Sequence, residues 1–155
     1  MQRTASRVII LTFCSLLGLF IGVGSFTFWY AQGASYLSDD PAACVNCHVM
    51  RPQFAAWQSS SHHAVATCNS CHVPHDLIGK YYTKAENGYH HSYAFTFQTF
   101  PETIRMREAS RQIVLANCVA CHAALMDGIA AHQSDPQQQI DCLRCHAGVG
   151  HGANN

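Results

Sequence analysis

Eight of the nine cysteines fall into four copies of one short pattern, Cys-x-x-Cys-His. The copies are Cys44, Cys47 and His48; Cys68, Cys71 and His72; Cys118, Cys121 and His122; and Cys142, Cys145 and His146. Two thiols three positions apart can bond the two vinyl groups on one edge of a porphyrin, and the adjoining imidazole can reach the iron. Cysteine pairs also build zinc ribbons and disulfide redox centres, and the 20 residues between Cys47 and Cys68 would suit a four-cysteine zinc site.

The histidine after each pair separates these possibilities. Histidine occupies 11 of 155 positions, so its chance occurrence after all four pairs has a probability on the order of 10⁻⁵. Haem attachment requires this histidine, whereas zinc ribbons and disulfides do not. The sequence therefore predicts four covalently bound haem c groups. The first cysteines of successive copies are separated by 24, 50 and 24 residues, which predicts two pairs of closely spaced haems, over residues 44–72 and 118–146.

A membrane anchor is predicted at the start of the chain. Residues 8–30 contain no charge, and a helix of that length rises about 34 Å, enough to cross a hydrocarbon core of about 30 Å. Arg3 and Arg7 precede this segment, whereas the first charges after it are Asp39 and Asp40. The positive-inside rule then places the N-terminus in the cytoplasm. We expect a single-pass anchor in the cytoplasmic membrane over residues 1–31 and a periplasmic haem domain over residues 32–155.

A cleaved signal peptide is the alternative, because Ala31, Gln32 and Gly33 have the small-x-small spacing of a cleavage site. The apolar run exceeds the 7 to 15 residues typical of such signals, which favours the retained anchor. Cys14 lies inside the run and is interpreted as a small apolar residue without a redox role.

Composition limits the remaining fold. Charged residues make up 12% of the chain, nine basic and nine acidic, which excludes a basic nucleic-acid-binding module. About 31 residues per haem are too few for a separate apolar core around each, so the porphyrins must supply much of the core. Helices are predicted over residues 53–62, 77–95 and 102–117, and the Gly-rich residues 147–155 are not predicted to be ordered. The expected fold class is all-α, with a loop-rich tetrahaem domain behind one transmembrane helix.

Each low-spin haem needs a second axial ligand, by preference His or Met. The candidates outside the four motifs are His62, His63, His75, His90, His91, His132, His151, Met50, Met106 and Met126.

Two stretches resemble a known family. Residues 35–62, SYLSDDPAACVNCHVMRPQFAAWQSSSH, and residues 84–96, KAENGYHHSYAFT, are similar to the NapC/NirT/NrfH family of membrane-anchored multihaem quinol dehydrogenases. The resemblance implies that Met50 replaces His48 as the axial ligand of haem 1. From the residues alone, either side chain could be the ligand. Two positions apart on a helix, they point about 200° from one another, so they cannot both bind one face of the haem. Met50 could also pack on the porphyrin without binding the iron.

The resemblance also implies the remaining ligands. His62 and His151 match distal-ligand positions, so we expect them on two of haems 2 to 4. The last haem would then use His75 or His132, have an empty sixth site, or be completed by a residue of another subunit.

A quinol site follows from the same resemblance. Lys84 matches a lysine near haem 1, and His91 matches a position where some relatives have Asp. A His could accept a quinol proton, or could approach the haem iron instead. Lys84 could also be a solvated or propionate-paired lysine, and Glu86 is a weaker candidate.

The implied function is oxidation of menaquinol, with electrons passed through the haems to the catalytic subunit of a periplasmic cytochrome c nitrite reductase. Three alternatives remain at this point: a NapC-like dehydrogenase that serves another reductase, an electron shuttle without quinol chemistry, and a terminal reductase of a small oxyanion.

Overall fold

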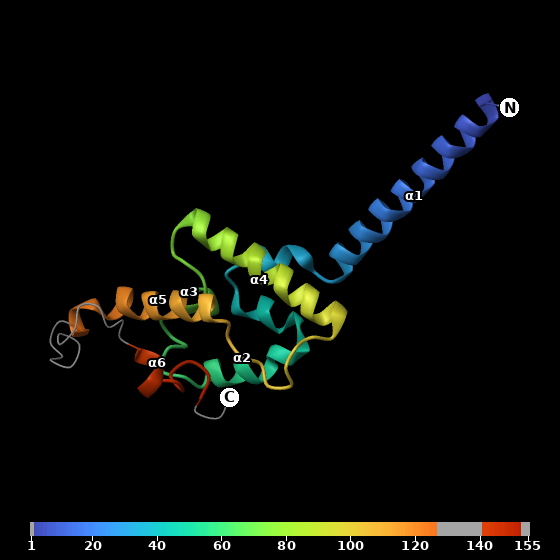
Figure 1. The fold of residues 1–155 in the computed structure, drawn as a ribbon. Coiled ribbons are helices and arrows are strands. Elements are labelled where there is room, and N and C mark those ends of the chain that lie inside the picture. The colour runs from blue at the N-terminus through green and yellow to red at the C-terminus, as the bar shows by residue number, and fades with distance from the viewer. Residues whose placement is uncertain (1, 127–140, 153–155) are drawn as a thin grey trace. The chain divides into compact units, whose positions relative to one another are not determined.

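The computed structural model describes residues 2–126 and 141–152 and divides the chain into two units, Met1–Ser38 and Asp39–Asn155. In the first unit, helix α1 runs over Gln2–Tyr30 (Figure 1). Its segment Arg3–Tyr30 has a mean hydropathy of 2.3 over its most apolar window and is the one helix in the described residues that is long and apolar enough to cross a membrane. The apolar segment seen in the sequence therefore forms one continuous helix.

A tight turn ends α1. Gln32 adopts the left-handed conformation with φ 53°, and its amide donates to the carbonyl of Trp29. Gly33 follows and lies against the ring of Phe28, where a Cβ would collide with that ring. The short 3₁₀ helix η1 then occupies Gly33–Leu37.

The second unit is built from short helices and loops. In chain order these are η2 (Pro41–Asn46), η3 (His48–Met50), α2 (Arg51–Gln58), α3 (Cys68–His72), α4 (Leu77–Phe97), α5 (Glu108–Met126) and α6 (Cys142–Cys145). The described residues contain no strand. The predicted all-α class is confirmed.

Helix α4 confirms the prediction for residues 77–95 almost residue for residue. Its first turn is capped by the Asp76 carboxylate, which accepts a hydrogen bond of 2.7 Å from the Gly79 amide. Its last turn ends at Gln98, which has a left-handed φ of 54°.

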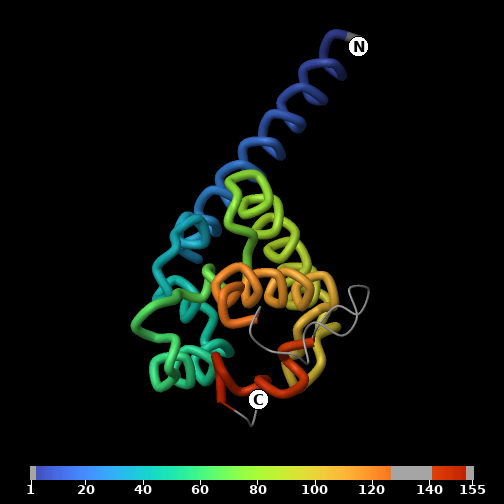
Figure 2. Tube along the Cα trace, turned by 90° about the vertical axis from the view of Figure 1, so that its left-hand side faces the viewer, coloured from blue at the N-terminus to red at the C-terminus, as the bar shows by residue number. Residues whose placement is uncertain are grey.

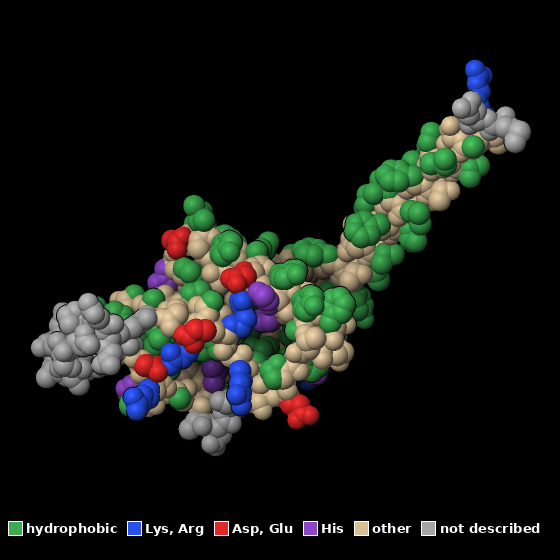
Figure 3. Space-filling view, in the orientation of Figure 1, with side chains coloured by type: hydrophobic (Ala, Val, Ile, Leu, Met, Phe, Trp, Pro, Cys, Tyr) green, Lys and Arg blue, Asp and Glu red, His purple; other side chains and the backbone are tan. Residues whose placement is uncertain are grey.

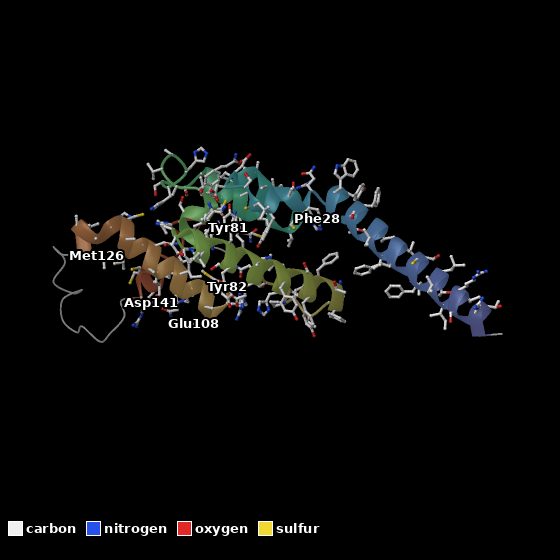
Figure 4. The ribbon with its side chains drawn as sticks, turned by 90° about the horizontal axis from the view of Figure 1, so that it is seen from above. Phe28, Tyr81, Tyr82, Glu108, Met126 and Asp141 are labelled. Carbon is white, nitrogen blue, oxygen red and sulfur yellow. The ribbon has the colours of Figure 1, made fainter. Side chains whose placement is uncertain are left out.

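The prediction for residues 102–117 was wrong at both ends. Helix α5 begins six residues later, at Glu108, and continues through the third cysteine pair to Met126 (Figure 4). Its start is delayed because Arg107 donates hydrogen bonds to Glu86 (3.0 Å) and Asn87 (2.8 Å) of α4. These contacts hold the preceding segment outside the helix.

The helix predicted over residues 53–62 also differs from the structure, because α2 ends at Gln58. The serines that follow bond locally and compete with the helix. The Ser59 hydroxyl donates to the Ala55 carbonyl, and the Ser60 hydroxyl accepts from the His62 amide. The chain turns here and brings His62 back towards the third motif.

The C-terminal segment lies beside α2, as Figures 1 and 2 both show. His151 Nδ1 lies 3.1 Å from the carbonyl of Gln53. Residues 147–151, which were not predicted to be ordered, form turns, and the amide of the next residue, Gly152, donates to the Gly148 carbonyl.

The apolar core of the polypeptide is very small. Only three hydrophobic side chains are buried in the described residues: Val73, Val114 and Leu115. They lie where α3 and its following residue meet α5. Residues 39–155 therefore cannot be held together by polypeptide packing alone, as expected of a chain wrapped around large apolar cofactors.

Candidate haem-binding and quinol site

Each cysteine pair lies in or beside a helix. The first pair lies at the junction of η2 and η3, the second forms α3, the third lies inside α5, and the fourth forms α6. Helix α3 is set by a capping box in which the Thr67 and Ser70 side chains bond each other's amides. In the last two motifs the histidine leaves helical geometry, with φ −108° and ψ 16° at His122 and φ −112° and ψ 30° at His146.

The cysteine chemistry fits thioether attachment. All nine cysteines are free thiols, and in residues 2–126 and 141–152 no three His, Cys, Asp or Glu side chains converge as a metal-binding group. A zinc ribbon needs such a convergence, whereas haem attachment needs separate pairs, each followed by its own imidazole. The described residues therefore fit four haem c groups better than zinc.

Consecutive motifs are neighbours in space. A hydrogen bond between the Cys44 and Cys68 thiols lowers the pKa of Cys44 to about 7 and raises that of Cys68. The pKa of Cys118 is raised by burial and then by the charges of Cys142, Cys71 and Cys121. These contacts connect the first motif to the second, the second to the third, and the third to the fourth, which suits electron transfer along a row of haems.

Asn117 joins the second and third motifs. Its side chain is 8% exposed, and its Nδ2 donates to the carbonyls of Cys71 and Val73, both at 2.9 Å. The residue lies one position before Cys118, so it fixes the third cysteine pair relative to the end of α3.

Two pairs of imidazoles face one another. The ring centroids of His62 and His122 are 6.1 Å apart, and those of His72 and His151 are 5.8 Å apart. An iron bound by two imidazoles lies about 2 Å from each nitrogen, with each ring centroid roughly 1 Å further, so the centroids lie about 6 Å apart. Both pairs therefore have the separation that one six-coordinate haem iron requires.

Local contacts orient these rings. Because Nδ1 of His151 lies against the Gln53 carbonyl, Nε2 is the candidate ligand atom. Nδ1 of His62 lies 3.3 Å from the Ser61 hydroxyl, which leads to the same assignment there. Burial and the neighbouring His151 lower the pKa of His72, which favours the neutral imidazole that a metal ligand needs.

The first and fourth motifs have no such imidazole pair among the described residues. In the first, His48 is exposed and Met50 is half-buried at the other end of η3. In the fourth, His146 is exposed. His75, a candidate partner, has its Nε2 3.0 Å from the Ser70 carbonyl, and His132 lies outside the described residues.

Lys84 lies in the interior of the second unit. Its side chain is 5% exposed, and its Nζ lies 3.6 Å from Asp39, a carboxylate that also pairs with Lys80 and accepts a hydrogen bond of 2.7 Å from Asn69. The pKa of Cys44 is lowered mainly by its hydrogen bond with Cys68, and the positive charge of Lys84 lowers it further. Lys84 is therefore a buried cation near the first cysteine of the chain's first motif.

His91 lies two helical turns further along α4, on the same face as Lys84. Its side chain reaches solvent, but its pKa is lowered. The main cause is desolvation by surrounding atoms, and the charges of Arg107 and His90 add to it. Arg107 is itself held by Glu86, which also lies 3.8 Å from His90 Nε2. Glu86 thus belongs to the charged surroundings of His91.

Three residues of the site were missed in the sequence: Asp39, Arg107 and Asn117. In the sequence, Asp39 served only as evidence for the orientation of the anchor. Its position just before the first motif is the signal that could have marked it as a partner for Lys80 and Lys84. Arg107 and Asn117 both lie within the segment interpreted as one helix, and no sequence signal marks their long-range hydrogen bonds.

Comparison with known proteins agrees with this arrangement. A sequence model of the NapC/NirT cytochrome c family, N-terminal region, matches residues 4–155. The cytochrome c-type protein NrfH of Wolinella succinogenes is 40% identical over 153 residues, covering 92% of this chain and 86% of that protein. The cytochrome c nitrite reductase subunit NrfH of Nitratidesulfovibrio vulgaris is 32% identical over 121 residues, covering 78% and 72%.

A solved structure is also similar. The crystal structure of the cytochrome c nitrite reductase NrfHA complex bound to the HQNO inhibitor contains a chain that matches with a TM-score of 0.63 and 27% identity, covering 95% of this chain and 92% of that one. The apolar α1 and these similarities indicate a membrane-anchored protein with covalently bound haem c. The predicted family is confirmed: the chain belongs to the NapC/NirT family of c-type cytochromes.

Proposed function

We propose that this chain is a membrane-anchored tetrahaem cytochrome that oxidises menaquinol and passes the electrons to a periplasmic cytochrome c nitrite reductase catalytic subunit. The observation that carries the proposal is the position of Lys84, a buried cation near Cys44 that shares one face of α4 with His91. The NrfH relatives support the nitrite reductase partner. The inhibitor named in the similar complex, HQNO, supports a quinol site.

We assign the cysteines of the four motifs to the thioether bonds and propose an axial pair for each haem. His72 and His151 would hold haem 2, and His122 and His62 would hold haem 3, because each pair has the required separation. Met50 would bind haem 1, supported by its burial relative to the exposed His48. His146 would hold haem 4, completed by His75, by His132 or by a residue of the catalytic subunit.

The haems supply one-electron carriers, whereas menaquinol gives up two electrons and two protons. The chain's own residues must therefore bind the quinol and accept its protons. We propose that the Lys84 ammonium donates a hydrogen bond to one quinol oxygen and that an imidazole nitrogen of His91 accepts the two protons in turn. His91 is exposed and can pass each proton to water, while the two electrons leave the quinol one at a time for the haems. The lowered pKa of His91 keeps this imidazole neutral near pH 7, so it can act as the base.

We infer the topology from the charges around α1. Arg3 and Arg7 support a cytoplasmic N-terminus, and an anchor over residues 1–31 would leave the haem domain, residues 32–155, in the periplasm. Haem attachment to an exported domain is consistent with this orientation.

The test is reduction of the purified, haem-loaded chain in lipid vesicles by a menaquinol analogue, followed by haem absorbance. We expect Lys84→Ala to slow reduction by at least about tenfold, because a charge-assisted hydrogen bond to the quinol is lost. Lys80→Ala is the matched control, since Lys80 lies on the same helix and pairs with the same Asp39. Dithionite must reduce all variants equally, which shows intact haems. Failure of the unmodified chain to accept electrons from the quinol analogue would refute the proposal.

A further inference from the structure

Helix α4 turns an apolar face to the outside of its unit. Ile78, Tyr82, Tyr89 and Tyr93 are spaced by four, seven and four residues, so they form one stripe along the helix, here called the outer face of α4. They are 82%, 69%, 66% and 48% exposed. No charged residue lies within the arc that they span on the helix surface.

The polarity of α4 is thus opposite to that of an ordinary surface helix. Its two buried residues are Thr83 and Lys84, which are 4% and 5% exposed. A surface helix of a water-soluble domain buries its apolar stripe and exposes its polar residues. Figure 3 shows hydrophobic side chains, in green, along the length of α4. An apolar stripe of this length calls for a partner that covers it.

The aromatic rings of the outer face continue as a row. The ring centroids of Tyr89 and Tyr93 are 6.2 Å apart, and those of Tyr93 and Phe97 are 4.6 Å apart. Figure 4 marks Tyr82 on the same helix. Tyrosine combines an apolar ring with a polar hydroxyl, which is the chemistry favoured at the level of lipid headgroups.

The porphyrin of the first motif does not account for this stripe. Lys84 and His91, which lie on one face of α4, are about 160° around the helix from Tyr82 and Tyr89. Lys84 acts on the thiol of Cys44, so the first cysteine motif is on its side of the helix. The outer face of α4 points away from that side.

Chain length keeps α4 close to the membrane. Only eight residues separate Tyr30, the end of the apolar segment, from Asp39, which is bonded to Lys80 and Lys84 of α4. Five of the intervening residues form η1, so this linker spans at most about 25 Å. With α1 in the bilayer, a tether of this length holds α4 within reach of the lipid surface.

We propose that the outer face of α4 lies on the phospholipid surface, with its tyrosines at the headgroup level. The uncharged stripe makes the contact depend on buried apolar area and not on anionic lipid. This inference goes beyond the proposed quinol chemistry and does not depend on it.

The test is photolabelling of the full, haem-loaded chain in phosphatidylcholine vesicles that contain a diazirine-bearing phosphatidylcholine. Mass spectrometry then locates the lipid adducts. We expect adducts on α1 and on α4 but not on α5, and we expect the α4 adducts to persist in 0.5 M salt, roughly the range in which surface charge is screened. Absence of α4 adducts above the level of α5 overturns the proposal.

Variants sharpen the test. Tyr82→Ser, Tyr89→Ser and Tyr93→Ser together should reduce α4 adducts at least about fivefold while α1 adducts stay unchanged. The matched control changes an exposed apolar residue of α5 outside the cysteine motif, Leu125→Ser, and should leave α4 adducts unchanged. Equal haem absorbance confirms that each variant is folded, and the single change Tyr89→Ser replaces the triple variant if that one loses haem.

Protein partners are the competing occupants. If protein crosslinks replace lipid adducts on α4, either between copies of the chain or with the catalytic subunit, the face is a protein interface and the lipid proposal fails. Quinol-dependent haem reduction is measured separately, so loss of the lipid contact and loss of the proposed function can be told apart.

Discussion

Asn117 offers a direct test of how the second and third haem units are held together. Its Nδ2 donates to the carbonyls of Cys71 and Val73, both at 2.9 Å, and the second of these bonds is buried. Replacing Asn117 with Leu preserves the approximate volume but leaves both carbonyls without this donor. A buried unpaired acceptor costs about 1–3 kcal/mol and a partly buried one less, so the expected loss of stability is about 2–4 kcal/mol.

The assay is thermal unfolding of the haem-loaded chain in detergent, followed by haem absorbance. At a few degrees per kcal/mol, Asn117→Leu should lower the midpoint by at least about 5 °C. Gln112→Leu is the matched control on the same helix, because the Gln112 side-chain amide donates to the exposed carboxylate of Glu108 and not to a buried carbonyl. The reasoning is refuted if the two variants unfold within about 1 °C of each other, a difference below the cost of one lost buried hydrogen bond.

The remaining predictions concern the iron ligands and the proton acceptor. Substituting Ala for His62 or His151 should convert one low-spin haem to a high-spin form in the EPR spectrum, and the double variant should convert two. The same substitution at the exposed neighbour His63 is the control. An unchanged spectrum in either single variant contradicts the assignment. For the base, quinol-dependent reduction should rise as pH increases through the lowered pKa of His91, because only the neutral imidazole accepts a proton. Arg107→Gln removes a positive charge that depresses this pKa, so the rising limb should move to higher pH; a limb that stays in place or moves to lower pH argues against His91.

Several features of the chain could be predicted because local sequence determines them. The spacing of the cysteine motifs is a chemical requirement of the cofactor, and the apolar α1 and the cap of α4 at Asp76 depend on neighbouring residues alone. The start of α5 could not be predicted in this way. It depends on Arg107, whose partners on α4 are about 20 residues away, and these bonds outweigh the helix propensity of the intervening segment.

The sequence predicted which residues belong to the candidate site, but not which of them lie opposite one another. His62 and His151 could be singled out as ligand candidates, but their positions opposite His122 and His72 depend on how the loop after α2 and the C-terminal turn fold back. Likewise, the burial of Lys84 depends on Asp39, which lies 45 residues earlier. Interactions between distant segments leave little trace in the local sequence pattern.

The three buried apolar side chains Val73, Val114 and Leu115 also bear on how the cell makes this protein. Under the proposed topology, a polypeptide with so small a core would stay open after export, and its cysteine pairs would remain accessible to the enzymes that ligate the porphyrins. Folding would then be the final step of maturation, and a copy that misses one haem would stay open to the proteases of that compartment. The small polypeptide core would in this way act as quality control, because fully loaded chains would resist proteolysis best.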